Sequence, residues 1–142
     1  MNNHKILDNE VIYNHNGSIN IFIMTQRFGP LEKWDTSLIT TMNGWFYCCD
    51  FNDKISKWKT SNVTDMSYMF AHSTFNREIE DWDISNVKNM SYMFAHTVFN
   101  QKISRWNISN VSNMRCMFHN NYYFIDIYNP EWDAYKIVDM YL

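Results

Sequence analysis

A tryptophan recurs at a constant interval along this 142-residue chain, at Trp34, Trp58, Trp82 and Trp106. The residues between them repeat as well: the segment that begins at Trp58 and the segment that begins at Trp82 share fourteen identical positions. A fixed period of this length is typical of repeat proteins, in which each unit is too small to bury its own apolar face and buries it against its neighbours. We therefore predict a solenoid, and we call each repeat unit that begins near a Trp a rung.

Apolar residues occupy the same places in successive rungs. Met lies eight residues after the Trp, and Phe or Tyr lies seventeen residues after it. The two columns consist of Met42, Met66, Met90 and Met114, and of Phe51, Phe75, Phe99 and Tyr123. Such columns predict a core that runs through the stacked rungs, with Trp58, Trp82 and Trp106 stacked inside it.

The spacing within a rung predicts one short helix and one short strand. In the second rung Val63, Met66 and Phe70 have helical spacing, and the Ser61-Asn62 pair before them can cap a helix. Residues 79–84 alternate about a Trp and suit a short strand. The predicted fold class is therefore an α/β repeat solenoid similar to leucine-rich repeats.

The N-terminal segment differs from the rungs. Residues 10–14 and 18–24 flank a His15-Asn16-Gly17 turn, and Asn-Gly between apolar runs is a strong hairpin signal. We predict that residues 1–28 form a β-hairpin cap over the open edge of the first rung and that residues 29–142 form the repeat solenoid.

The C-terminal segment departs from the period. The step from Trp106 to Trp132 exceeds the earlier steps by two residues, so a partial fifth rung starts near Trp132, with Met140 as its eighth residue after the Trp. The chain ends in Met140, Tyr141 and Leu142, which are apolar where a solenoid normally closes with a polar cap. We expect this end to take part in end-to-end association or in docking to another protein.

Composition argues against several classes of protein. The chain has 12 Lys+Arg against 15 Asp+Glu, a net charge of −3, which is not the basic footprint of a nucleic-acid binder. No stretch approaches the ~20 apolar residues of a membrane span. The start lacks a basic segment followed by an apolar one, so we expect no signal peptide and favour an intracellular or virion-associated protein over a secreted one. The 3 cysteines include no CxxC pair, which favours reduced thiols.

One column has metal-binding residue types. The position fourteen residues after the Trp holds Cys48, His72, His96 and Asn120. Stacked rungs lie about 5 Å apart, so adjacent imidazoles can share a metal ion, but a structural zinc site wants four ligands and this column offers at most three. We interpret it as a row of polar residues at a solvent-exposed turn and expect no metal. The Met and aromatic columns are interpreted as core filler, so no cofactor is expected.

A column of asparagines lies eighteen residues after the Trp. Its members are Asn52, Asn76 and Asn100. Because a stacked Asn can hydrogen-bond both to its neighbours and to the turn backbone, we interpret this column as a structural ladder.

The residues on either side of each Trp are the predicted partner face, because outward strand residues line the concave surface of horseshoe-like solenoids. Together with the C-terminal end, the candidate partner surface is Lys57, Lys59, Asp81, Asp83, Arg105, Asn107, Met140, Tyr141 and Leu142. The column before the Trp alternates in sign from Lys57 onward, which predicts charge pairs between neighbouring rungs. This face lacks the exposed Tyr, Trp or Arg cluster of a binding hot spot.

The repeat motif W-x-x-S-N-V-x-x-M-x-x-M-F, followed by F-N-x-x-I, resembles the BspA-like repeats of bacterial surface proteins, which also occur in some giant viruses and protists. The resemblance extends from Phe28 to Met140. It implies a leucine-rich-repeat-like solenoid that acts in adhesion or other protein binding and does not catalyse a reaction.

The expected function is therefore a protein-interaction or adhesion scaffold with a protein partner. The alternative is a structural component of a virion or cell envelope that self-associates end to end. An enzyme is not expected, because no Gly-rich phosphate loop, Rossmann fingerprint or HExxH pattern occurs.

Overall fold

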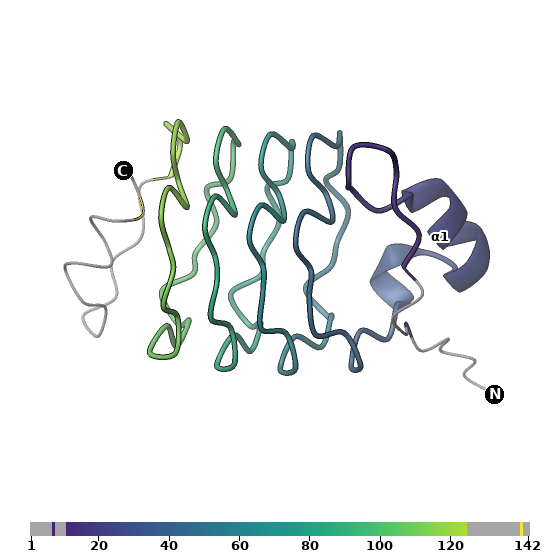
Figure 1. Ribbon diagram of the computed structural model, residues 1–142, viewed down its shortest axis with the longest axis horizontal. Helices are drawn as coiled ribbons and strands as arrows, with labels where there is room; N and C mark the ends of the chain where they lie inside the picture. The colour runs from purple at the N-terminus through teal and green to yellow at the C-terminus, as the bar shows by residue number, and fades with distance from the viewer. Residues whose placement is uncertain (1–6, 8–10, 125–139, 141–142) are drawn as a thin grey trace.

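The computed structural model describes residue 7, residues 11–124 and residue 140. Its helices are α1 (Ile21–Phe28) and the short 3-10 helix η1 (Leu31–Lys33); the rest of the described chain is irregular, contains no β-strand and is rich in turns. Figure 1 shows successive coils of the chain lying side by side in sequence order, beginning next to α1. Two expectations are therefore wrong, because the described residues of the rungs form neither the short helix nor the short strand.

Backbone hydrogen bonds connect each rung to the next. Over residues 66–72 of the second rung every other N–H group donates across to the third, and the pairs are Met66 to Asn89, Tyr68 to Ser91, Phe70 to Met93 and His72 to Ala95. The N···O distances are 2.9–3.0 Å. The first and third rungs donate in the same way, and single parallel bridges join Thr41, Asp65, Asn89 and Asn113. The alternate N–H groups are thus satisfied by a neighbouring rung.

The remaining N–H groups of this segment close tight turns, which explains why no helix forms. The N–H of Met69 donates to the carbonyl of Met66 at 3.2 Å, and the same three-residue step recurs twice before residue 74. Tyr68 and His72 have φ of 57° and 58°, the left-handed conformation that the third residue of a type II turn requires. An α-helix needs right-handed residues and bonds to the carbonyl four residues earlier, so it is excluded here.

Turns also replace the predicted strand beside the Trp. Trp82 donates its N–H to the carbonyl of Ile79 at 3.1 Å, and Val87 donates to that of Ile84 at 2.9 Å. The Ser-Asn pairs do not cap helices: the Asn86 side-chain amide donates 2.7 Å across to the carbonyl of Ser61 in the previous rung. These amides therefore add a further link between rungs.

The four repeated tryptophans lie in the core, each at most 4% exposed. Trp58 stacks between Trp34 and Trp82, with ring centroids 5.8 and 6.4 Å away and interplanar angles of 6° and 3°. The indole N–H of Trp82 donates to the carbonyl of Ile55, 27 residues earlier, at 3.2 Å, and those of Trp58 and Trp106 donate at the same offset. Each indole thus contributes both burial and a bond to the preceding rung.

Two phenylalanine columns fill the rest of the aromatic core. One consists of Phe46, Phe70, Phe94 and Phe118, with successive centroids 5.5–5.6 Å apart. The other was predicted to end in Tyr123, but Phe124 stacks on Phe99 at 5.9 Å and Tyr123 is 59% exposed. The slip of one residue follows Asn121, whose side-chain oxygen accepts the N–H groups of both Tyr123 and Phe124.

The N-terminal segment forms a tight turn followed by a helix. Asn14 donates its N–H to the carbonyl of Ser18 at 2.7 Å and residues 13 and 19 form an antiparallel bridge, so the hairpin turn is present. The expected second strand over 18–24 is wrong, because α1 begins at Ile21. Asn20 caps the helix with its side-chain oxygen and Gly29 ends it with φ of 81°; both are residue types favoured at these places.

The C-terminal prediction is tested at one residue. Met140 is fully buried, and its carbonyl accepts the N–H of Phe118 at 2.8 Å. In the preceding rung this bond goes from Phe94 to Met117, so Met140 takes the structural place of Met117 and not the expected place of Met114. Its burial removes Met140 from any exposed partner surface. Trp132, Tyr141 and Leu142 lie outside the described residues.

We predict that Trp82→Ala lowers the free energy of unfolding by about 3–5 kcal/mol, because it removes a buried indole between two rungs. Urea denaturation followed by circular dichroism measures the change. Lys57→Ala, at an exposed position on the same side of the rungs, should change it by less than about 0.5 kcal/mol. Equal stability of the two variants would contradict the stacked-Trp core.

Candidate interaction surface

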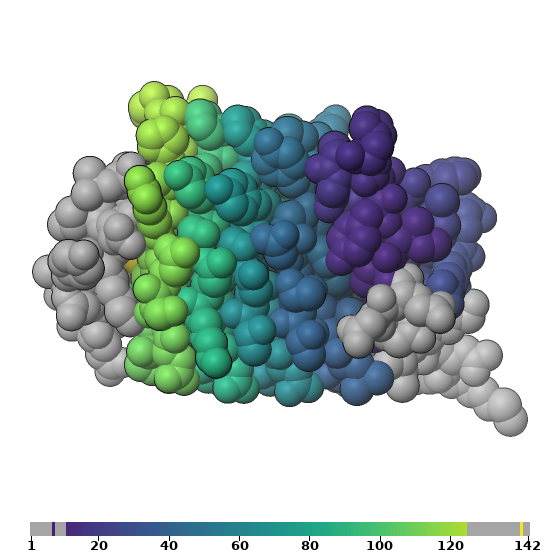
Figure 2. Space-filling model, in the orientation of Figure 1, coloured from purple at the N-terminus to yellow at the C-terminus, as the bar shows by residue number. Residues whose placement is uncertain are grey.

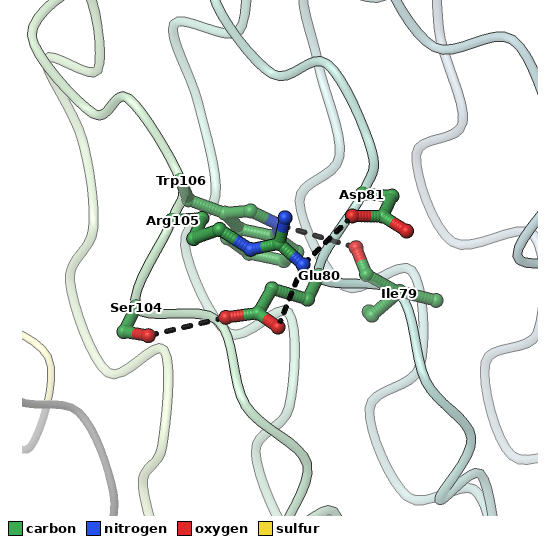
Figure 3. Close-up of polar contacts among 6 residues, drawn as sticks. All are labelled: Ile79, Glu80, Asp81, Ser104, Arg105 and Trp106. Carbon is green, nitrogen blue, oxygen red and sulfur yellow. Dashed lines mark hydrogen bonds and ion pairs between the residues drawn. The ribbon is translucent and has the colours of Figure 1, made fainter.

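The predicted face beside the tryptophans is exposed, and its charges are largely paired within the protein. Figure 3 shows Arg105 between two carboxylates, at 3.0 Å from Asp81 and 3.3 Å from Glu80. Lys59 lies 3.4 Å from Asp35 in the preceding rung. The predicted pairing between rungs thus holds for Arg105 and Asp81; among the described residues no ion pair joins Lys57 to Asp81.

Two other polar residues of this face accept hydrogen bonds from a Ser two positions further along the chain. The Asp83 carboxylate accepts the N–H of Ser85 at 3.0 Å, and Asn107 accepts the N–H and the hydroxyl of Ser109. The hydroxyl and N–H of Ser85 hold the pKa of Asp83 below its usual range. Side chains used in this way stabilise turns and are less available to a partner.

We call the surface beside the tryptophans, with Lys57, Lys59, Asp81, Asp83 and Arg105, the charged face. Sequence reasoning missed Glu80, which lies at its centre. Its carboxylate accepts from the Ser104 hydroxyl at 3.1 Å as well as from Arg105, whose hydrogen bond lowers the pKa of Glu80. Glu80 and Ser104 both lie two residues before a Trp, so the repeat period could have predicted that they lie side by side. An open depression on this face is lined by both signs of charge, including Lys102 and Glu78, and carries no net preference for an anion or a cation.

A different stretch of each rung presents aromatic side chains to solvent. We define the aromatic face as Tyr47, Tyr68, His72, Tyr92, His96 and His119, contributed by four successive rungs. Tyr68 stacks on Tyr92 with centroids 4.8 Å apart, and His72 stacks on His96 at 4.3 Å. The column of His72 and His96 was predicted as an exposed turn, and both side chains are exposed. The tyrosine column ten residues after the Trp was not singled out.

The backbone at this face is unusual for the side chains that it carries. Tyr68, His72, Tyr92 and His96 have φ of 56–58°. The left-handed conformation costs a residue with a Cβ about 1–2 kcal/mol, and Gly or Asn adopts it most readily. The equivalent left-handed positions of the first and fourth rungs hold Gly44, Cys48, Cys116 and Asn120. Ring stacking offsets part of this cost in the two middle rungs.

Three groups of the aromatic face have pKa values shifted in the direction that favours the uncharged form. The Cys48 thiol beside Tyr47 raises the pKa of that phenol, and Cys116 raises the pKa of Tyr92. Burial, followed by the neighbouring His72 and His119, lowers the pKa of His96. Hydroxyl and imidazole groups on an apolar ring system are typical of the residues that dominate protein interfaces.

The histidine stack does not have the geometry of a metal site. The rings of His72 and His96 are within 11° of parallel, and a metal lies in the plane of an imidazole that binds it. Nitrogens of two stacked, parallel rings therefore do not point at one ion. Among the described residues no group of three His, Cys, Asp or Glu side chains lies close enough to hold a metal.

The asparagine column forms the predicted ladder. The side-chain oxygen of Asn52 accepts the backbone N–H of Asn76 at 2.9 Å, and that of Asn76 accepts the N–H of Asn100 at 2.9 Å. These bonds link rungs at a third place on the coil. Figure 2 shows the rungs packed against one another on the face in view.

We predict that Arg105→Ala lowers the free energy of unfolding by less than about 1 kcal/mol, because its ion pairs are exposed to water. The difference from the wild type should shrink further at about 1 M salt, where exposed charges are screened within a few ångströms. Urea denaturation at low and high salt measures both quantities. A loss above about 2 kcal/mol, well beyond the contribution of exposed ion pairs, would show that the charged face holds the rungs together.

We predict that Tyr68→Asn changes the free energy of unfolding by less than about 1 kcal/mol in either direction. The lost ring stacking, about 0.5–1.5 kcal/mol, opposes the relief of left-handed strain at φ of 57°. Phe70→Ala, two residues along and buried, should cost about 3–5 kcal/mol in the same urea titration. A similar loss in both variants would make Tyr68 a core residue.

Comparison with known proteins finds a family and no individual relative. A family model described as "Mycoplasma protein of unknown function, DUF285" matches residues 18–132. No curated protein and no solved structure matches the chain. Among the described residues no helix is long and apolar enough to cross a membrane.

Proposed function

Since the chain belongs to the DUF285 family, whose description assigns no activity, we propose its function from its own residues: a non-enzymatic scaffold that binds another protein. The resemblance to BspA-like repeats supports adhesion or other protein binding. The regular repeat period and the hydrogen bonds between successive rungs support a leucine-rich-repeat-like solenoid as the scaffold, although its rungs are made of turns. Stacked repeats of this kind present extended surfaces to partners.

We place the partner site on the aromatic face. The single observation that carries this assignment is that stacked ring pairs, Tyr68 on Tyr92 and His72 on His96, occupy left-handed positions where Gly or Asn is less strained. Non-glycine residues held in strained conformations cluster at functional sites. Tyrosine is also enriched among the residues that contribute most to binding energy.

The charged face is a weaker candidate for the same role. Its best-placed cation, Arg105, already contacts Asp81 and Glu80, so a partner would have to break these contacts to use it. Exposed ion pairs of this kind contribute little affinity and act mainly on the rate of association. We therefore propose that the charged face keeps the protein soluble and pairs charges between neighbouring rungs, and does not bind the partner.

We predict that replacing Tyr68 and Tyr92 together by Asn abolishes partner capture. Affinity capture from the native source, read by mass spectrometry, should yield a protein that the wild-type chain retains and the double variant loses. Lys57→Ala/Arg105→Ala, on the charged face, should retain it. Capture by the Tyr double variant together with loss in the charged-face variant would move the site to the charged face.

The self-association alternative is tested on the purified chain alone. Sedimentation equilibrium over a wide concentration range should show a monomer if the protein acts through a separate partner. Concentration-dependent oligomers that persist in the Tyr68→Asn/Tyr92→Asn variant would favour a structural or assembly component instead.

A further inference from the structure

Three histidines form a row across consecutive rungs of the aromatic face. His72 stacks on His96 with centroids 4.3 Å apart and an interplanar angle of 11°. His119 meets His96 edge-on at 5.5 Å. The amide of Asn120 lies 3.5 Å from Nδ1 of His96. Each imidazole thus contacts the next one, and an uncharged amide lies beside the central ring.

Among the described residues no carboxylate forms an ion pair with the row. Tyr47, from the first rung, packs edge-on to His72 at 5.8 Å and is neutral. Asp50, a carboxylate of the first rung, accepts the hydroxyl of Thr74 at 2.8 Å. On the fourth rung, Arg115 acts electrostatically on Tyr92, and the charges that act on His96 are those of His72 and His119. Within the described residues, a protonated row therefore has no ion-paired counter-charge.

We infer that the histidine row is an acid-sensitive element that weakens the contact between the middle rungs when more than one of its imidazoles is protonated. The inference rests on the proposed function only in that the row belongs to the aromatic face. Neutral imidazoles can stack, whereas two imidazolium ions in neighbouring rungs repel each other at this separation.

The strained backbone increases the effect of protonation. His72 and His96 are held at φ of 58° and 56°, and the contact between their rings offsets part of that strain. When repulsion removes the contact, the left-handed cost remains. Acid thus removes a stabilising contact from rungs that also carry Tyr68 and Tyr92, and it places positive charge on the aromatic face.

The direction of the pH dependence follows from proton binding. Burial and the two neighbouring histidines depress the pKa of His96 below the ordinary histidine value of about 6.5. An unfolded chain then binds more protons than the folded one as the pH falls below that value, so stability decreases with falling pH. The loss begins near the ordinary histidine pKa and is complete once His96 is protonated in the folded state.

The test compares the wild-type chain with the double variant His72→Asn/His96→Asn. Urea denaturation is followed for each at about pH 7.5 and about pH 5.5. Asn accepts the left-handed conformation and holds the equivalent position at Asn120, so the variant should fold at least as well as the wild type at the higher pH. The control is His15→Asn, in the exposed hairpin turn.

We expect the urea midpoint of the wild type and of the control to fall on acidification, and that of the double variant to fall by no more than about half as much. A nuclear magnetic resonance titration of the ring protons should give His96 a midpoint below the ordinary histidine value of about 6.5. An equal fall in all three chains, or a His96 midpoint no lower than about 6.5, overturns the inference. Because both measurements use the isolated chain, neither result depends on whether a partner binds the aromatic face.

Discussion

Hydrogen bonds between neighbouring rungs set the register of this structure. Every other N–H group from Met66 to His72 donates to the next rung, and the intervening ones close turns within their own rung. Each partner in the next rung must present its carbonyl at the right height, so the repeat cannot gain or lose a residue in this segment. The aromatic columns follow from this register, since Phe46 and Phe70 are brought to 5.6 Å by it.

The turns impose a second constraint, which separates core from surface within a few residues. Met66, Met69 and Phe70 lie inside and Tyr68 and His72 lie outside, because each left-handed residue reverses the direction of the chain. In the middle rungs the left-handed positions carry rings that reach the surface, while Cys116 at the equivalent place in the fourth rung is buried. Gly44, Cys48 and Asn120 hold the remaining equivalent positions, so the fold does not require an aromatic ring there.

Much of the core could be predicted from the period alone, and the local backbone could not. Burial of Trp82 and the ladder from Asn52 to Asn100 follow from side chains repeated at equal spacing. The helix predicted at Val63, Met66 and Phe70 was wrong because a three-residue turn places positions i and i+3 on one side, as a helix does. Apolar spacing does not distinguish the two. In the N-terminal segment, Asn20 and Gly29 were overlooked as helix-cap signals beside the stronger Asn-Gly turn signal.

The spacing of the apolar residues is enough to identify which columns are buried, because apolar residues at a constant interval must share one environment. The backbone that joins those columns depends on the stacked rungs, because left-handed residues and their hydrogen bonds are stabilised by the neighbouring rung. The fold also places Phe124, and not Tyr123, in the core, since the side chain of Asn121 accepts the N–H groups of both residues and one extra residue is accommodated there. The aromatic face was decided in the same way: Tyr68 and Tyr92 are distant in the chain, and stacking the rungs brings them to 4.8 Å.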